Sequence, residues 1–203
     1  MPPIVSDSHK EKKKKEILAS ALVCFAKKGF QVATIDDIVG HSGISKGAIY
    51  NYFKSKDEIY LELMNTDTKE TYESLVKDLG TYSSAIEKIN FLFDCYIWVD
   101  FSNKEIQGKF IVHDEFKLHA SRHPELAEKL TERRKQYFVD LISEIIKEGQ
   151  ESGEIKKDLQ PEVMADLFWS MINGVTIQSV YTDYPFKQVL TEMKQMFLEK
   201  IKS

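Results

Sequence analysis

Apolar residues recur along this chain with the 3.6-residue period of an α-helix, and no segment alternates as a half-buried strand does. Glycine, proline and short polar clusters separate the periodic segments. The longer helices are predicted at residues 12–28, 56–78, 84–101, 105–121, 124–152, 161–182 and 186–202. With two short helices between residues 34 and 53, the pattern predicts an all-α fold of about nine helices. Residues 1–10 are polar and are expected to form a flexible arm.

The most informative segment is residues 34–59, TIDDIVGHSGISKGAIYNYFKSKDEI, which predicts two short helices joined by a tight turn. Thr34 followed by Asp37 is spaced as a capping box at the start of the first short helix. Gly43 ends that helix, because glycine tolerates the left-handed conformation of a sharp turn. Ser45 caps the second short helix, so both the start and the angle of this helix are specified locally.

The second short helix has two faces of different chemistry. Lys46, Gly47, Tyr50 and Asn51 share one face by helical spacing, and Ile49 points the opposite way. A donor-rich outer face on a short, braced helix suits the major groove of DNA. Shortly afterwards Ser55 and Glu58 form a third cap signal, which puts Lys56 in the first turn of the next helix, where free N–H groups favour a phosphate.

The order and spacing of these residues resemble the N-terminal helix-turn-helix of the TetR family of bacterial transcriptional regulators. The resemblance covers about residues 16–59 and rests on Thr34, Ile38, Gly43, Ile44, Ser45, Lys46, Gly47, Ile49, Tyr50, Tyr52, Phe53, Ser55 and Lys56. Val39 and Ser42 stand where that family commonly has alanine, and both are small enough for a contact between helices. The resemblance implies a DNA-binding domain at residues 1–56 and an effector-binding and dimerisation domain at residues 57–203.

Roles in DNA binding are carried over from that family pattern. Lys46 is expected at a guanine edge, Gly47 at a close approach, Ala48 at a thymine methyl group and Asn51 at a base. The residues expected to bind phosphates are Thr34, Ser45, Tyr50, Tyr52 and Lys56. An alternative for Tyr52 is packing beside Ile49. The predicted partner is a double-stranded DNA operator of pseudo-palindromic sequence.

The C-terminal body is rich in aromatic residues with polar groups between them, which is typical of a small-molecule site and also of an ordinary core. The resemblance favours a cavity for an unidentified small-molecule effector of hydrophobic or aromatic character. Its candidate lining residues are Phe91, Tyr96, Phe110, His113, Phe116, Trp169 and Asn173. In the resembling family the helix after the reader helix couples ligand binding to the spacing of the DNA-binding heads.

The last two predicted helices carry more apolar positions than one buried face needs. Two such helices from each of two copies are expected to form a four-helix interface, as in the resembling family, and the alternative is packing within one subunit. The candidate interface residues of this homodimer are Met164, Phe168, Met171, Val175, Val189, Met193, Met196 and Phe197.

Charge is distributed unevenly along the 203 residues. The net charge is −4, but residues 1–60 carry 10 basic and 7 acidic residues, and the remainder carries 18 and 25. A basic head on an acidic body fits a DNA-binding protein. The run Lys12 to Lys15 has two readings, a contact with the DNA backbone or a solvated helix start. Cys24 and Cys95 are expected to be buried, reduced thiols of a cytoplasmic protein.

Other protein classes are disfavoured by the motifs. The sequence contains neither a glycine-rich phosphate loop nor a nucleophile elbow, so no catalytic residue, enzyme activity or cofactor is predicted. Glu115, His119 and His123 share a helical face, but Pro124 ends that helix and no metal site is predicted. No apolar run is long enough for a membrane span. The competing function is a helical small-molecule-binding or scaffolding protein without DNA readout.

Overall fold

The computed structural model describes residues 7–203, and this part of the chain is all-α, as predicted. The helices are α1 (Asp7–Lys28), α2 (Ile35–Ser42), α3 (Lys46–Tyr50), α4 (Lys56–Leu79), α5 (Ala85–Ile97), α6 (Lys104–Ala120), α7 (Pro124–Arg134), the π-helical segment η1 (Lys135–Val139), α8 (Asp140–Ser152), α9 (Pro161–Gln178) and α10 (Phe186–Ile201). Because α7, η1 and α8 follow one another without a break, they correspond to the single helix predicted at 124–152. None of the helices in this range is long and apolar enough to cross a bilayer.

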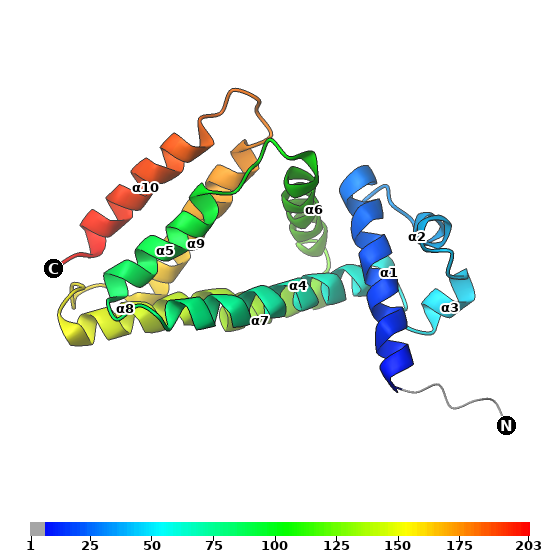
Figure 1. The fold of residues 1–203 in the computed structure, drawn as a ribbon, viewed down its shortest axis with the longest axis horizontal. Coiled ribbons are helices and arrows are strands. Elements are labelled where there is room, and N and C mark those ends of the chain that lie inside the picture. Colours follow the sequence, from blue (N-terminus) through cyan, green and yellow to red (C-terminus); the bar gives the residue numbers. More distant parts are fainter. Residues whose placement is uncertain (1–6) are drawn as a thin grey trace.

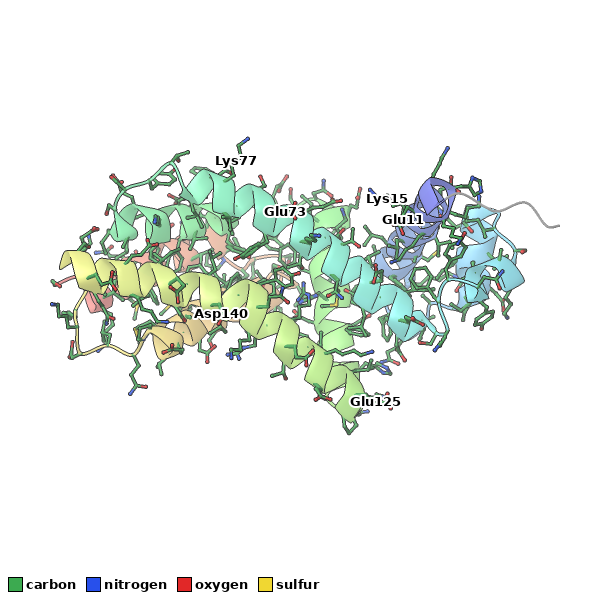
Figure 2. All side chains as sticks on the ribbon, turned by 90° about the horizontal axis from the view of Figure 1, so that it is seen from below. Glu11, Lys15, Glu73, Lys77, Glu125 and Asp140 are labelled. Atoms are coloured by element: carbon green, nitrogen blue, oxygen red, sulfur yellow. The ribbon has the colours of Figure 1, made fainter. Side chains whose placement is uncertain are left out.

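The molecule has a head at one end and a body at the other (Figure 1). Helices α1, α2 and α3 form the head, and α5, α9 and α10 lie at the far end, near the C-terminus. Helix α4 runs from the head into the body, and a view turned by 90° shows it beside the long rod of α7 and α8 (Figure 2). Helix α1 begins at Asp7, so the predicted flexible arm is wrong for residues 7–10, and residues 1–6 lie outside the described part.

The head core extends into the body helix α6. It contains buried side chains of α1 to α4 together with Val112, Phe116 and Ala120 of α6. The ring of Phe116 lies 4.9 Å from that of Phe30 and 4.6 Å from that of Tyr60, measured between centroids. Phe116 is fully buried among these rings as part of the head core, and its role as an effector-lining residue stays a prediction. Side chains from both sides of the predicted domain boundary at residue 56 therefore share one continuous core.

Two polar contacts also hold α6 against the head. The Phe30 N–H donates to Oε2 of Glu115 at 2.5 Å, and Nε2 of His119 lies 3.0 Å from Oδ1 of Asp57 at the start of α4. Gly29 adopts φ +79°, and a Cβ there would stand 3.0 Å from the Glu115 carboxylate. Two of the three residues of the rejected metal face are thus engaged with the head.

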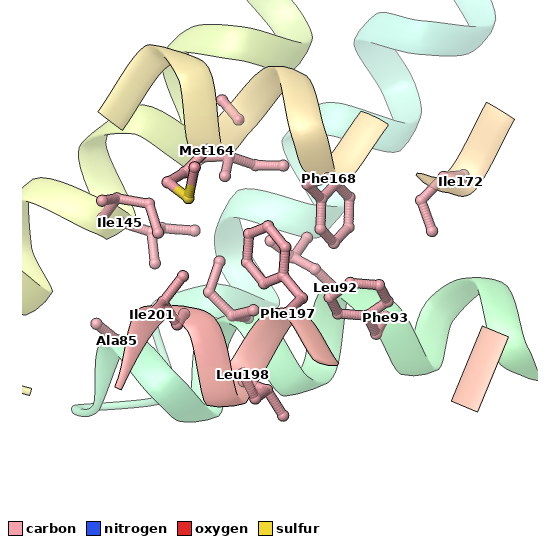
Figure 3. Close-up of a cluster of buried hydrophobic side chains, with 14 of the residues drawn as sticks. Ala85, Leu92, Phe93, Ile145, Met164, Phe168, Ile172, Phe197, Leu198 and Ile201 are labelled. Atoms are coloured by element: carbon pink, nitrogen blue, oxygen red, sulfur yellow. The ribbon is translucent and has the colours of Figure 1, made fainter. Parts of the chain in front are cut away.

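The body core is built where α5, α8, α9 and α10 converge (Figure 3). The ring centroid of Phe93 lies 4.6 Å from that of Phe168 and 5.6 Å from that of Phe197. Packing of this kind leaves four of the predicted dimer residues at most 7% exposed within a single copy, so their assignment to the interface is wrong. These four are Met164, Phe168, Val175 and Phe197. The strongest apolar stripe of α9 faces its own subunit, which was the alternative reading.

The two cysteines differ in their environment. Cys24 is buried in the head core, as predicted, and both thiols are free. Cys95 is exposed, which corrects the prediction for that residue. The reason is that α5 turns Leu92 and Phe93 into the body core, and Cys95 lies on another face of the helix.

Candidate functional site

The first helix of the predicted DNA reader starts with the capping box that the sequence indicated. Oγ1 of Thr34 accepts from the Asp37 N–H at 3.2 Å, and the Thr34 N–H donates to Oδ2 of Asp37 at 2.9 Å. The Lys28 ammonium and these Thr34 contacts lower the pKa of Asp37 to about 2. The hydroxyl of Thr34 is therefore occupied within the cap, although the residue is exposed.

The turn and the reader helix also have the predicted geometry. Gly43 adopts φ +67°, and Oγ of Ser45 accepts from the Ala48 N–H at 3.3 Å. Ile49 is fully buried and fixes the inner side of α3, whose outer side leaves Tyr50 47% exposed. Lys46, Gly47 and Asn51 are exposed as well, and Ala48 is half-buried. The structure thus brings four of the predicted base or phosphate contacts to one accessible surface.

Lys46 makes one ion pair on this surface. Its Nζ lies 2.8 Å from Oδ1 of Asp36 on α2, and this hydrogen-bonded contact raises the pKa of Lys46. Both side chains are at least half-exposed, so water screens the pair and it contributes little to stability. The ammonium can exchange this partner for a base edge at small cost.

Tyr52 and Lys56 are held more tightly than the other predicted contacts. Tyr52 is half-buried against the head core, in agreement with its alternative reading. The Lys56 ammonium donates to the carbonyls of Phe30, Gln31 and Ala33 at 2.8, 2.9 and 3.3 Å. Since an ammonium has three protons, these contacts use all of its donors. Lys56 braces the loop before α2, and a phosphate contact through its side chain would require breaking that loop contact.

The lysine run on α1 is partly engaged by carboxylates. Nζ of Lys13 lies 2.8 Å from Glu16, and Lys14 pairs with Glu62 of α4. Lys12 and Lys15 are exposed. Lys14 therefore links α1 to α4, and the contact of this run with DNA stays a prediction.

The residues predicted to line an effector cavity are distributed over several clusters. Tyr96 and Trp169 meet edge to face at 5.9 Å, whereas Phe91 packs on Tyr82 and Phe110 on Phe101. Asn173 accepts from the Lys117 ammonium at 3.2 Å. A surface groove between α5 and α10 contains none of the seven. Of the seven, Tyr96 and Trp169 are in mutual ring contact, and the effector-lining role of the set stays a prediction.

His113 of α6 is half-buried. Burial, with the positive charges of Lys117 and Arg133, lowers its pKa from 6.5 to about 3. The imidazole is therefore neutral in the folded protein at pH 7. In the unfolded chain the same group takes up a proton at its ordinary pKa.

Acid is consequently expected to destabilise the protein through His113. The unfolded state binds this proton from pH 6.5 downwards and the folded state only near pH 3, so stability falls as the pH decreases through that window. Between pH 7.5 and 5.5 the loss is about 1 kcal/mol. Urea unfolding of wild type and His113→Gln at both pH values tests this. The variant should lack about 1 kcal/mol of the pH dependence, and equal dependence in both proteins contradicts the assignment.

Apolar side chains are also exposed on the outer faces of α9 and α10. These faces combine the exposed residues Val163, Ile177 and Met196 with half-buried Met171, Val189 and Met193. Val180 and Tyr181 extend the surface beyond the end of α9. The sequence predicted more apolar positions on α9 than one buried face needs, but the interface residues proposed from it for this helix lie mostly on the stripe that turns inward.

Two family models match most of the chain. Residues 17–63 match the family described as bacterial regulatory proteins, tetR family, and residues 97–190 match a tetracyclin repressor-like C-terminal domain. The first match spans the head up to the first turns of α4. The second covers α6 to α9 and the start of α10.

Individual proteins agree with these matches. The chain is 28% identical over 206 residues to the uncharacterized HTH-type transcriptional regulator YfiR of Bacillus subtilis, covering 99% of this chain and 97% of the relative. It is 29% identical to the HTH-type transcriptional repressor AcnR of Corynebacterium jeikeium, covering 85% and 84%. The solved structure of the regulator FadR from Bacillus subtilis in complex with stearoyl-CoA has the same fold, with a TM-score of 0.74, 19% identity and coverage of 92% and 98%.

Proposed function

The chain belongs to the TetR family of bacterial regulatory proteins, and on that basis we propose that it is a dimeric repressor of a pseudo-palindromic DNA operator in the cytoplasm. A small-molecule effector releases it. The observation that carries the proposal is the outer face of α3, where Lys46, Gly47, Tyr50 and Asn51 are exposed together on a helix held by buried Ile49.

Each exposed residue on this face of α3 is assigned a contact with DNA. Lys46 reads a guanine edge, Gly47 admits close approach, Ala48 meets a thymine methyl group and Asn51 reaches a base. Tyr50 and the cap residue Ser45 position the head on phosphates. Thr34 joins them only by exchanging its hydrogen bond to Asp37 for one to a phosphate. Tyr52 and Lys56 support the head from within, since one packs on its core and the other holds its loop.

Dimerisation uses the outer faces of α9 and α10. The exposed side chains of Ile177 and Met196, with half-buried Met171, Val189 and Met193, form the apolar surface that a second copy covers. Two reader helices about 34 Å apart then contact successive turns of one DNA face, which sets the spacing of the half-sites.

The effector acts through its preference for one arrangement of the two heads. Suppose the ligand binds more tightly to the dimer whose heads are not spaced for the operator. It then lowers operator affinity only as far as its affinities for the two arrangements differ. The relative AcnR carries the name repressor, and the FadR structure holds stearoyl-CoA, which supports repression relieved by a ligand with an apolar part.

Removal of the Lys46 ammonium tests the reader assignment. On an operator selected from genomic DNA, Lys46→Ala is expected to weaken binding by about 10- to 100-fold and to relax preference at one base pair. The measurement is a titration of labelled operator and of single-base variants at fixed salt, with Tyr50→Phe alongside to probe a phosphate contact.

Lys69→Ala provides the matched control, because Lys69 is an exposed lysine on α4 outside the head. It should leave operator affinity within about twofold. Unchanged affinity and base preference in Lys46→Ala would refute the reader assignment. If the wild type binds all sequences alike and competitor DNA displaces it, the scaffolding alternative holds.

A further inference from the structure

Arg133, at the end of α7, lies against α4 without an acidic partner. Its Nη2 donates to the Met64 carbonyl at 3.4 Å and to the Thr68 hydroxyl, both on α4. Its guanidinium carbon lies 5.0 Å from the centre of the Phe138 ring. Nε is buried and donates to nothing, and within residues 7–203 no carboxylate oxygen lies within 4 Å of the guanidinium.

The neighbouring Arg134 shows what is unusual about this arrangement. Arg134 is half-exposed and pairs with Asp166. The guanidinium of Arg133, in contrast, is part-buried, and a carboxylate or phosphate normally compensates such a group for the hydration it loses. Burial accordingly lowers the pKa of Arg133. With five N–H donors and only two acceptors, the group retains buried capacity to bind an anion.

The groups facing Arg133 from the packed helices are mostly neutral. Tyr60 on α4 and Tyr137 in η1 are phenols, and burial raises the pKa of Tyr60. His113 of α6 is uncharged at pH 7. Asp67 of α4 is the acidic residue whose field reaches the guanidinium, and burial raises its pKa as well. An incoming anion therefore meets the cation of Arg133, and of these four groups Asp67 carries the charge that opposes it.

An aromatic row begins next to this cation. The Phe138 and Trp169 rings meet edge to face at 4.8 Å, and Tyr96 continues the row beyond Trp169. The Trp169 indole N–H donates to the Phe138 carbonyl at 3.0 Å, within the π-helical segment. Such segments interrupt the regular helix bonds and recur at functional sites. A charged group and an apolar wall thus lie side by side.

We propose that Arg133 binds the anionic group, a carboxylate or a phosphate, of an effector whose apolar part lies along Phe138 and Trp169. This inference rests on the proposed function as an effector-released repressor. The bound anion takes the guanidinium from Met64 and Thr68, so α4 loses a contact with α7. Because α4 continues into the head at Lys56, the same event changes how the head is held.

Three ten-carbon probes test the chemistry: decanoate, decyl phosphate and decanamide. Calorimetry on the wild-type protein should show one or both anions binding at least about tenfold more tightly than the neutral amide. The stronger of the two anions identifies the head group. Arg133→Met should bind that anion about 10- to 100-fold more weakly and the amide unchanged. Arg133→Lys keeps a cation and should retain part of the preference.

Arg134→Met is the matched control and should bind all probes like the wild type. Without ligand, Arg133→Met should melt within about 2 °C of the wild type or higher, because it removes an unpaired buried charge. A fall of more than about 8 °C makes Arg133 a structural residue and overturns the proposal. The proposal is also overturned if the two anions bind no more tightly than the amide, or if no probe binds. Anion affinity that is undiminished in Arg133→Met overturns it as well. Operator binding by Arg133→Met without ligand should persist, which separates this test from that of Lys46.

Discussion

Truncation of Phe116 to alanine is expected to lower the free energy of unfolding by about 3–5 kcal/mol. The ring is fully buried and contacts Phe30 of the loop after α1 and Tyr60 of α4, so its loss opens a cavity between α6, α4 and that loop. Chemical denaturation monitored by circular dichroism measures the change. The same cavity loosens α6 from the head, and operator affinity should fall with stability.

Leu118→Ala serves as the control on the same helix. Leu118 is 71% exposed, so its truncation should change stability by no more than about 0.5 kcal/mol. If Phe116→Ala costs less than about 1 kcal/mol, the ring does not join the head to α6. A ligand-lining role for Phe116 predicts the opposite pair of results, with little loss of stability and a large loss of effector binding.

Substitution of Ile177 by glutamate should abolish the dimer and weaken operator binding by more than about 100-fold. In a two-fold symmetric dimer the substitution is present in both copies, so two unpaired carboxylates enter the apolar interface. Together they weaken the free energy of dimerisation by at least about 3 kcal/mol. Each half-site is then bound alone. Sedimentation equilibrium gives the mass, and operator titration gives the affinity.

Val76→Glu is the control, since Val76 on α4 is 42% exposed and Ile177 43%. It introduces the same charge outside α9 and α10 and should leave a dimer with unchanged operator affinity. A dimeric Ile177→Glu protein would exclude this face of α9 from the interface. A monomeric wild type at working concentration would remove the two-fold model altogether.

The head was predictable because its signals are local. Thr34, Gly43 and Ser45 act through backbone positions within three or four residues of themselves, and the structure has each cap as expected. Helical spacing also distinguished the inner side of α3 from its outer side, since Lys46, Gly47, Tyr50 and Asn51 centre on a direction that Ile49 faces away from.

The body was harder to predict because its contacts are long-range. Helical spacing places Phe168 and Phe116 on apolar faces of their helices. It does not say whether such a face packs on the subunit's own core, on a partner subunit or on a ligand. Both residues proved to be core. Arg133 was missed because an arginine in a charged helix is usually exposed to solvent. The sequence does not show that it packs against α4 and Phe138 without a carboxylate partner.

The extension of the head core into α6 limits how this regulator can be re-engineered. A chimera that joined residues 1–56 to another regulator's body would leave Phe30 without the covering ring of Phe116, and the Phe30 N–H without Glu115. Such a graft is expected to be poorly soluble unless the recipient's own helix supplies an equivalent surface. Transplanting operator specificity through the exposed residues of α3 alone keeps that shared core intact.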